Sequence, residues 1–243
     1  MAAAWATLAL MSRGAVYTPL RPGTTARRSL ALGVTAVVAW ALILGVVVAF
    51  GWLITHPWGH AVNSFDDPVS RWFAGERTPT LNTTAEVGTF FGETVVGMAV
   101  AAAAAIGFSL WQRALRPAVF LALVTAGVGG VYFVATLADP RQRPPVRILD
   151  TGLVPDHSFP SGHVGTATAV YGAIAVLCWA YARSSRSWAW VLLVLPLLVL
   201  LARLYQGAHH LTDVLTSVLY ATVWVIVLAR LLLTGGARLS SGR

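Results

Sequence analysis

The chain contains no lysine and only one cysteine, and few of its residues are charged. All seventeen basic residues are arginine, so every fixed positive charge that could build a site is a guanidinium. The single cysteine, Cys178, lies inside an apolar run, which excludes a disulfide within the chain. Charged residues make up 11% of the sequence, against about 25% in a typical soluble domain. With 57% hydrophobic residues and a mean hydropathy of +0.71, the chain is predicted to be an integral membrane protein.

The net charge of +8 does not indicate a nucleic-acid partner. The arginines are spread between apolar runs, whereas a nucleic-acid-binding protein gathers them on one basic face. We therefore expect membrane lipids, and no nucleic acid, as partners.

Six apolar runs approach the roughly 20 residues that a membrane-spanning helix needs. They cover residues 29–54, 92–111, 117–137, 163–181, 188–204 and 211–233. The segment 55–91, with Asp66, Arg71 and Trp72, has the pattern of a short interfacial helix. The sequence thus predicts an all-α, polytopic membrane protein with six transmembrane helices and a short interfacial helix after the first. We expect one domain over residues 29–235, between cytoplasmic tails at 1–28 and 236–243.

The arginines predict the orientation of these spans, because cytoplasmic flanks carry an excess of basic residues. One side holds six arginines: Arg71, Arg77, Arg141, Arg143, Arg147 and Arg203. The opposite side holds the other eleven: Arg13, Arg21, Arg27, Arg28, Arg113, Arg116, Arg183, Arg186, Arg230, Arg238 and Arg243. The larger set is predicted to be cytoplasmic. All histidines and acidic residues then collect on the outer side or at its membrane edge, where we expect an outward-facing site.

The stretch 157–163 (HSFPSGH) lies where a polar loop ends and the fourth apolar run begins. Ser161, Gly162 and His163 are predicted to open a helix, whose free N–H groups and dipole suit a phosphate. The loop before this stretch carries Arg143, and the short link between the fifth and sixth spans carries Arg203 and His209. Both connections are expected on the outer side, so they can form one site.

His209 and Asp213 are four residues apart, which on a helix places them on one face. A carboxylate there could fix the tautomer of the imidazole and leave its other nitrogen as a nucleophile or base. Two alternatives remain open: a hydrogen-bonded pair at a helix start with no chemistry, and a metal site made with His210. Arg203 adjoins an apolar run, where an ionisable residue indicates function unless it snorkels to the interface.

Taken in order, these residues resemble a known family. Arg143-Pro144, then Pro160-Ser161-Gly162-His163, then Arg203 with His209 and Asp213 are similar to the three signature motifs of the type 2 phosphatidic acid phosphatase superfamily, which are membrane lipid phosphatases related to vanadium haloperoxidases. Two positions depart from the pattern: Thr136 replaces the family lysine, and Ala202 replaces the serine before Arg203. Arg141 could supply the missing charge.

The resemblance implies a phosphatase that hydrolyses lipid phosphates or diphosphates without a metal or other cofactor. His209 would form a phosphohistidine, Asp213 would orient and charge its ring, and His163 would act as general acid and then base. Arg143, Arg203, Ser161 and the Gly162 N–H would hold the phosphate oxygens. The alternative is a degenerate member that binds lipid headgroups as a transporter or scaffold. Neither the particular lipid nor the oligomeric state is predicted.

Overall fold

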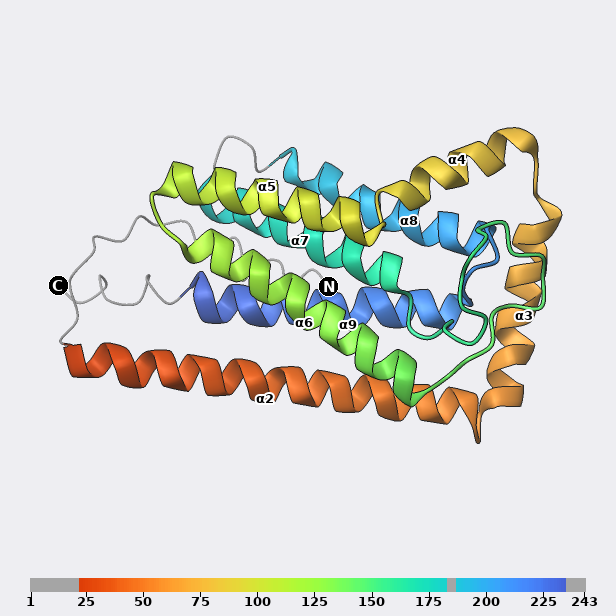
Figure 1. Cartoon of the computed structure of the whole chain (residues 1–243), viewed down its shortest axis with the longest axis horizontal. Helices are drawn as coiled ribbons and strands as arrows, with labels where there is room; N and C mark the ends of the chain where they lie inside the picture. Colours follow the sequence, from red (N-terminus) through yellow and green to blue (C-terminus); the bar gives the residue numbers. More distant parts are fainter. Residues whose placement is uncertain (1–21, 183–186, 235–243) are drawn as a thin grey trace.

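Helices form the regular structure of the chain in the computed structural model, which describes residues 22–182 and 187–234. They are α2 (Pro22–Thr55), α3 (Gly59–Gly75), α4 (Pro79–Phe90), α5 (Thr94–Gln112), α6 (Arg116–Ala138), α7 (Gly162–Tyr181), the 3₁₀ helix η2 (Ala189–Leu193), α8 (Val194–Tyr205) and α9 (Leu211–Leu232). The long helices run lengthwise in one bundle, and α3 crosses one end of it (Figure 1). Within the described residues no β-strand forms, so the predicted all-α class is confirmed.

The predicted spans correspond to observed helices. Among the described residues, five helices are long and apolar enough to cross a membrane: α2, α5, α6, α7 and α9. The fifth predicted run forms a shorter apolar helix, Ala189–Tyr205, which begins as η2 and continues as α8. The first helix begins at Pro22, inside the predicted tail. The remainder of that tail, and the C-terminal tail from residue 236, lie outside the described residues. The chain is a multi-pass membrane protein.

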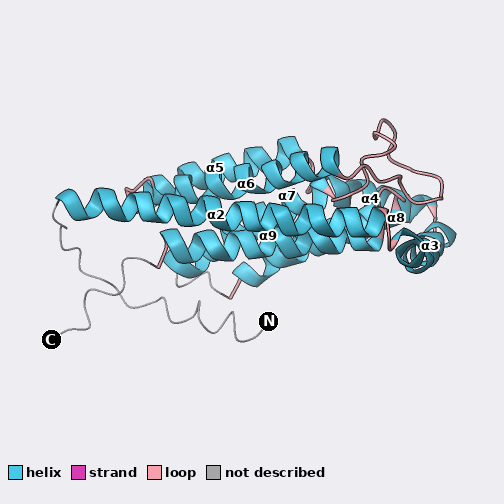
Figure 2. Cartoon of the chain, turned by 90° about the horizontal axis from the view of Figure 1, so that it is seen from below, coloured by secondary structure: helices cyan, strands magenta, loops and turns pink. Residues whose placement is uncertain are grey.

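The segment between the first two spans forms two helices, where the sequence predicted one. The predicted interfacial helix is α3, which exposes Phe65 and Trp72 and buries Asp66 and Ser70. Figure 2 shows α3 nearly end-on beside the bundle. Exposed aromatic rings at the end of a bundle suit the membrane–water interface. The second helix, α4, begins at an N-cap: the Thr78 hydroxyl accepts from the backbone N–H of Leu81 at 3.2 Å, and a proline follows it.

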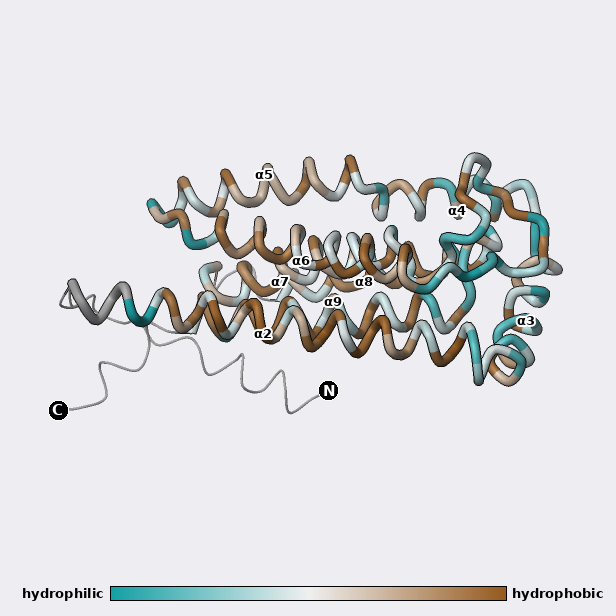
Figure 3. Tube along the Cα trace, turned by 60° about the horizontal axis from the view of Figure 1, so that its bottom comes forward, coloured by the Kyte–Doolittle hydropathy of each residue, from teal (hydrophilic) through white to brown (hydrophobic). Residues whose placement is uncertain are grey.

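The α7 helix lies at the centre of the bundle. Of the apolar part of α7, 61% is buried, against 17% in α2 and 11% in α5. The outer helices α2 and α5 present large exposed apolar side chains, such as Val37 and Val95. Figure 3 shows hydrophobic residues along the bundle and hydrophilic ones gathered at the end that carries α3 and α4. This pattern fits an apolar bundle in lipid with its polar loops at one end.

Two tryptophans clamp α6 between its neighbours. The indole N–H of Trp40, on α2, donates to the carbonyl of Gly127 at 2.9 Å, and that of Trp224, on α9, donates to the carbonyl of Leu123 at 3.0 Å. The ring of Trp224 occupies the space next to Gly127 in which a side chain would lie, and a Cβ built there would overlap the indole. Close contact at this glycine thus sets how near α6 lies to α9.

Replacing Gly127 with alanine is expected to destabilise the protein by about 1–3 kcal/mol, because the new methyl forces the packed Trp224 ring to move. Gly129→Ala on the same helix is the control, since a Cβ there meets nothing within 4 Å. Thermal unfolding in detergent would compare the two variants. Equal melting temperatures for both would show that the Trp224 contact does not limit this packing.

The described arginines of the two sets lie at opposite ends of the bundle, while Arg13, Arg21, Arg183, Arg186, Arg238 and Arg243 lie outside the described residues. Arg71, Arg77 and the arginines after α6 and in α8 lie at the end carrying α3, while Arg113 after α5 and Arg116 at the start of α6 lie at the other end (Figure 1). The acidic residues and the histidines share the α3 end. The helix order therefore separates the charged groups as the arginine pattern predicted.

Candidate active site

The two predicted loops meet at the α3 end of the bundle. The connection from α6 to α7 pairs with the link from α8 to α9: the backbone N–H of Leu149 donates to the carbonyl of Gln206 at 3.0 Å. A guanidinium N–H of Arg143 also donates to the carbonyl of Ala208. These contacts bring the start of α7, the end of α8 and the start of α9 to one place.

Arg203, in the last turn of α8, is fully buried and half paired. Its Nη1 donates to Asp150 Oδ2 at 2.6 Å and to Gln206 Oε1 at 2.9 Å. Its Nε and Nη2 have no hydrogen-bond partner in the described part of the chain. Nε and Nη2 form one edge of the planar guanidinium, which matches two oxygens of a phosphate. A buried donor without a partner is costly, so this edge indicates an anion site.

The helix start predicted at the HSFPSGH stretch is observed. α7 begins at Gly162, and Ser161 is its N-cap. The Ser161 hydroxyl is buried and caps no backbone N–H, and it has no hydrogen-bond partner among the described residues. A free hydroxyl and free backbone N–H groups thus coincide at one helix N-terminus, the environment that favours an anion.

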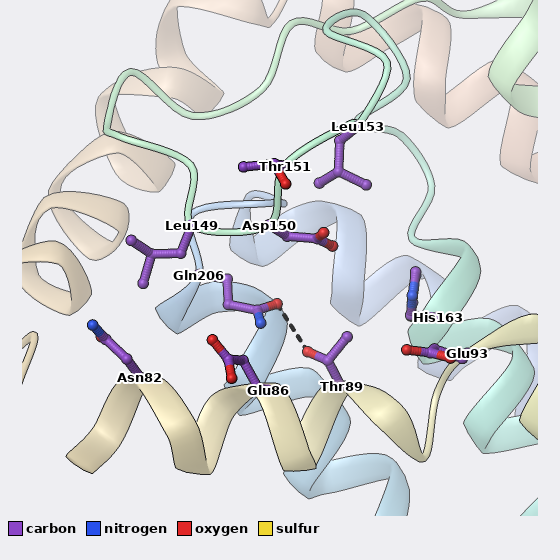
Figure 4. A pocket seen from close by; sticks show the side chains of 10 residues that line it. All are labelled: Asn82, Glu86, Thr89, Glu93, Leu149, Asp150, Thr151, Leu153, His163 and Gln206. Atoms are coloured by element: carbon purple, nitrogen blue, oxygen red, sulfur yellow. Dashed lines mark hydrogen bonds between the residues drawn. The ribbon is translucent and has the colours of Figure 1, made fainter. Parts of the chain in front are cut away.

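A cavity of about 520 Å³ opens beside this helix start. Figure 4 shows the residues that line it. They include His163 from α7, Thr89 from α4 and Gln206, which directly follows α8. Gln206 Oε1 accepts a hydrogen bond from the Thr89 hydroxyl at 2.8 Å, and the same oxygen accepts the hydrogen bond from Arg203 Nη1. The cavity also has three carboxylates on its wall, those of Glu86, Glu93 and Asp150. His163 therefore lies at the wall of a space that can hold a substrate headgroup.

His209 is buried, and its tautomer is fixed by a backbone carbonyl. Its Nδ1 lies 2.6 Å from the carbonyl oxygen of Ser158. A carbonyl only accepts, so Nδ1 must carry the proton and Nε2 keeps its lone pair. Burial, followed by the positive charge of Arg203, lowers the pKa of His209 well below its ordinary value. The ring is therefore neutral at pH 7, as a nucleophile must be.

The neutral ring predicts that His209 stays unprotonated when the pH falls from 7.5 to 6.0, where free histidine becomes mostly protonated. Histidine ¹⁵N spectra, with His209 assigned by comparison with His209→Gln, would measure this. Because the folded pKa is lowered, the unfolded chain binds more protons below about pH 6.5, so the stability due to this group falls as the pH falls. A His209 resonance half-protonated near pH 6.5 would contradict the buried neutral ring.

The direct hydrogen bond expected between Asp213 and His209 is absent, and in this detail the prediction was wrong. His209 Nδ1 and Asp213 Oδ2 are 4.0 Å apart, too far for a hydrogen bond. The spacing argument assumed one continuous helix, whereas α9 begins only at Leu211. Asp213 instead caps this helix, accepting from the backbone N–H of His210 at 2.8 Å. Its negative charge still lies close to the His209 ring.

Arg143 cross-links the loops through backbone carbonyls. Its Nε donates to Val154 at 2.9 Å and its Nη2 to His157 at 3.1 Å, in addition to the contact with Ala208. Its charge still contributes to lowering the pKa of His209. As a direct ligand of phosphate it remains a prediction.

The sequence did not single out Asp150 and Gln206, which contact this site, and it offered Arg141 only as a replacement for the charge missing at Thr136. Arg141 is buried, and it forms ion pairs with Asp66 at 2.9 Å and with Asp213 at 2.6 Å. Its two terminal nitrogens are thus committed to carboxylates. Asp66 and Asp213 lie 75 and 72 positions from Arg141 in the sequence, so no spacing rule could predict these ion pairs.

The two positions that depart from the family pattern are both buried. Thr136 is in α6, and its hydroxyl has no hydrogen-bond partner within the described residues. Ala202 packs in a small apolar cluster with Ala85 and Tyr205. A serine hydroxyl at position 202 would therefore lie in the contact between α4 and α8.

The alternative of a metal centre gains no support from the arrangement of side chains. In residues 22–182 and 187–234, no group of three or more His, Cys, Asp or Glu side chains is placed to hold a metal ion. Asp213, one of its three expected ligands, is already bonded by Arg141, Ser158 and His210.

The sequence profile of the PAP2 superfamily matches residues 117–236, a range that contains all the motif residues of the site. The chain belongs to the PAP2 superfamily. The family match, together with the bundle of apolar helices, supports a membrane lipid phosphatase, and a solved structure shows the same fold. This is the crystal structure of the first transmembrane PAP2 type phosphatidylglycerolphosphate phosphatase from Bacillus subtilis, which superposes with a TM-score of 0.65 at 23% identity. The alignment covers 80% of this chain and 92% of that one. No curated protein sequence matches the chain significantly.

Proposed function

We propose that this PAP2 protein hydrolyses the phosphate monoester or terminal diphosphate of a membrane lipid through a phosphohistidine at His209. The observation that carries the proposal is the unpaired edge of the buried Arg203, whose positive charge acts on the neutral His209, together with the unpaired hydroxyl of Ser161 at the start of α7. Together these groups provide hydrogen-bond donors for the phosphate oxygens and a nucleophile for phosphorus. The reaction follows from their chemistry in two steps.

In the first step, the Nε2 lone pair of His209 attacks phosphorus, and the bond from phosphorus to the lipid oxygen breaks. His163, at the cavity wall, donates a proton to that leaving oxygen, a proton that it takes up when the doubly negative phosphate binds beside it. The Nδ1 proton stays on His209, hydrogen-bonded to the carbonyl of Ser158, and the nearby negative charge of Asp213 stabilises the positive charge that forms on the ring.

In the second step, a water molecule attacks the phosphohistidine. His163, now neutral, takes the proton of the water while the P–N bond breaks and inorganic phosphate leaves. His209 returns to its starting state, so each cycle consumes one water and one lipid phosphate. Microscopic reversibility gives His163 both roles, acid and then base.

The phosphate oxygens are held by donors from two helix ends. The Nε–Nη2 edge of Arg203 would bind two oxygens, while the Ser161 hydroxyl and the Gly162 N–H would bind the third, with the charge of Arg143 behind them. Phosphoryl transfer depends mainly on positioning and on stabilising charge. Because guanidinium groups and the α7 dipole do this, we expect no metal to be required.

The lipid itself must carry a phosphate at headgroup depth and an apolar tail. Phosphatidic acid, phosphatidylglycerol phosphate and a polyprenyl diphosphate all satisfy this condition. We further propose that the site faces the outer (periplasmic or extracellular) side of the cell membrane, which the arginine pattern favours.

The outward orientation predicts that a cysteine placed at Val154, an exposed loop residue near the site, reacts in whole cells with a reagent that does not cross the membrane. The variant Val154→Cys would be made with Cys178→Ala, so that it carries the chain's one thiol. Labelling only after the cells are broken would place the site on the cytoplasmic side.

Phosphate release from vesicles tests the activity. Purified protein would be incubated with each of the three lipids in excess chelator, and inorganic phosphate would be measured. We expect release from at least one lipid. Release that chelator abolishes would contradict the metal-free mechanism, and no release from any lipid would favour a headgroup-binding scaffold instead.

A further inference from the structure

A buried charge network joins α3 to the start of α9. Arg141 is 5% exposed, and its two partners Asp66 and Asp213 are completely buried. The guanidinium bridges them, with Nη2 donating to Asp66 Oδ2 at 2.9 Å and Nη1 donating to Asp213 Oδ1 at 2.6 Å. Two buried carboxylates sharing one cation are costly to separate from it. Their positions are therefore coupled through Arg141.

Asp66 also holds the first turn of α9 directly. It accepts from the Thr212 hydroxyl at 2.6 Å and from the Thr212 backbone N–H at 3.2 Å. Arg141 Nη1 donates to the same hydroxyl at 2.7 Å. A side chain of α3 thus fixes the residue next to Asp213, on a different helix.

Ser158 connects this network to His209. Its backbone N–H donates to the carbonyl of Arg141 at 3.0 Å, and its hydroxyl donates to Asp213 Oδ2 at 2.6 Å. Its own carbonyl receives Nδ1 of His209 at 2.6 Å. The carbonyl oxygen that orients the imidazole therefore belongs to Ser158, whose backbone N–H and hydroxyl are in turn hydrogen-bonded to Arg141 and Asp213.

We propose that Asp66, Arg141 and Ser158 are positioning residues for His209: they hold the Ser158 carbonyl and the Asp213 carboxylate in the places that orient and charge the imidazole. None of the three needs to touch the substrate. Arg141 thus serves the nucleophile through Asp213, and it does not replace the cation missing at Thr136. The catalytic part of this inference rests on the proposed phosphatase activity, whereas the arrangement of the His209 ring does not.

A purely structural role for the network would be to attach α3 to the bundle. The two roles differ in what they change. Loss of attachment lowers stability alone, while loss of positioning lowers kcat at nearly constant KM and changes the charge that His209 experiences. Because Asp213 raises the pKa of His209 against the effect of burial and of Arg203 and Arg143, removing its counter-ion should make the ring easier to protonate.

The test uses Ser158→Ala, Arg141→Gln and the control Arg71→Gln. Arg71 lies on α3 in an exposed pair with Asp67 at 3.4 Å, so its loss probes α3 while the side chains of Asp66, Arg141 and Asp213 stay in place. We expect kcat to fall about 10- to 100-fold in Ser158→Ala and Arg141→Gln, the effect of one charge-assisted hydrogen bond, with KM changed less than about threefold. Arg71→Gln should match the wild type.

Two further measurements separate positioning from attachment. The double variant Arg141→Gln with Asp213→Asn should be no slower than Asp213→Asn alone, because a residue acting through Asp213 has nothing left to orient. Histidine ¹⁵N spectra of Arg141→Gln should show His209 protonating at higher pH than in the wild type. Additive losses in the double variant, with an unchanged His209 titration, would overturn the proposal.

Folding and function can be distinguished throughout. If Arg141→Gln does not fold, Ser158→Ala carries the test, and wild-type kcat in a folded Ser158→Ala protein would overturn the positioning role. If the wild-type protein hydrolyses no lipid phosphate, the proposed function fails. The arrangement of the His209 ring can still be tested without activity, by the His209 titration in Arg141→Gln or the His209 Nδ1–H resonance in Ser158→Ala. A signal that differs from the same signal in Arg71→Gln would support the arrangement, and an identical signal would contradict it.

Discussion

Turnover of lipid phosphate is expected to fall by at least about 10⁴-fold when His209 is replaced with glutamine, the scale of loss when a nucleophile is removed. Glutamine keeps a polar side chain of similar size, but it cannot form a phosphohistidine. The buried ring has one free nitrogen, because Nδ1 is committed to the Ser158 carbonyl. Initial rates of phosphate release at saturating lipid would measure the loss.

His157→Gln is the matched control for His209→Gln. It lies at the same end of the bundle, in the loop before α7, and its half-buried ring lies 3.7 Å from Asp156. We expect kcat within about twofold of the wild type. Substantial turnover in His209→Gln would show that another group attacks phosphorus.

The second large effect is expected at Arg203. Arg203→Lys should lower kcat/KM by about 10²- to 10³-fold, as for loss of one transition-state donor. The native guanidinium uses Nη1 to bond Asp150 and Gln206 and leaves its other edge free. A lysine ammonium cannot present both a fixed anchor and a planar two-donor edge.

Arg147→Lys is the control for Arg203→Lys, since Arg147 is an exposed arginine in the loop that follows α6. Its activity should match that of the wild type. The same steady-state assay, run at several lipid concentrations, gives kcat and KM for both variants. Equal losses of kcat/KM in the two variants would indicate a general effect of arginine at the membrane surface. They would contradict a role for Arg203 in binding the phosphate.

The fold could be predicted from the sequence because the length of an apolar run directly reports a membrane span. Each predicted run became a helix. The meeting of the two loops followed as well, since connections separated by an even number of spans emerge on the same side. In contrast, α4 was missed, although Thr78 and Pro79 form a recognisable helix start.

The candidate site was only partly predictable, and the limit lies in contacts between distant parts of the chain. Motif spacing identified His209, Asp213 and Arg203, because these residues are close in the sequence. It gave the wrong partner for the His209 ring, because it assumed a helix where the chain turns through His210 into α9. No local pattern pairs Arg141 with Asp66, since that ion pair depends on how α3 folds over the bundle end.

The most direct test of the central claim is to trap the covalent intermediate. Wild-type protein would be mixed with a lipid substrate carrying ³²P in the phosphate to be released, stopped in alkali after a few milliseconds, and digested for mass spectrometry. We predict an acid-labile, alkali-stable phosphate on His209, present in the wild type and absent from His209→Gln. Rapid phosphate release with no labelled protein, or with the label on a residue other than His209, would contradict it.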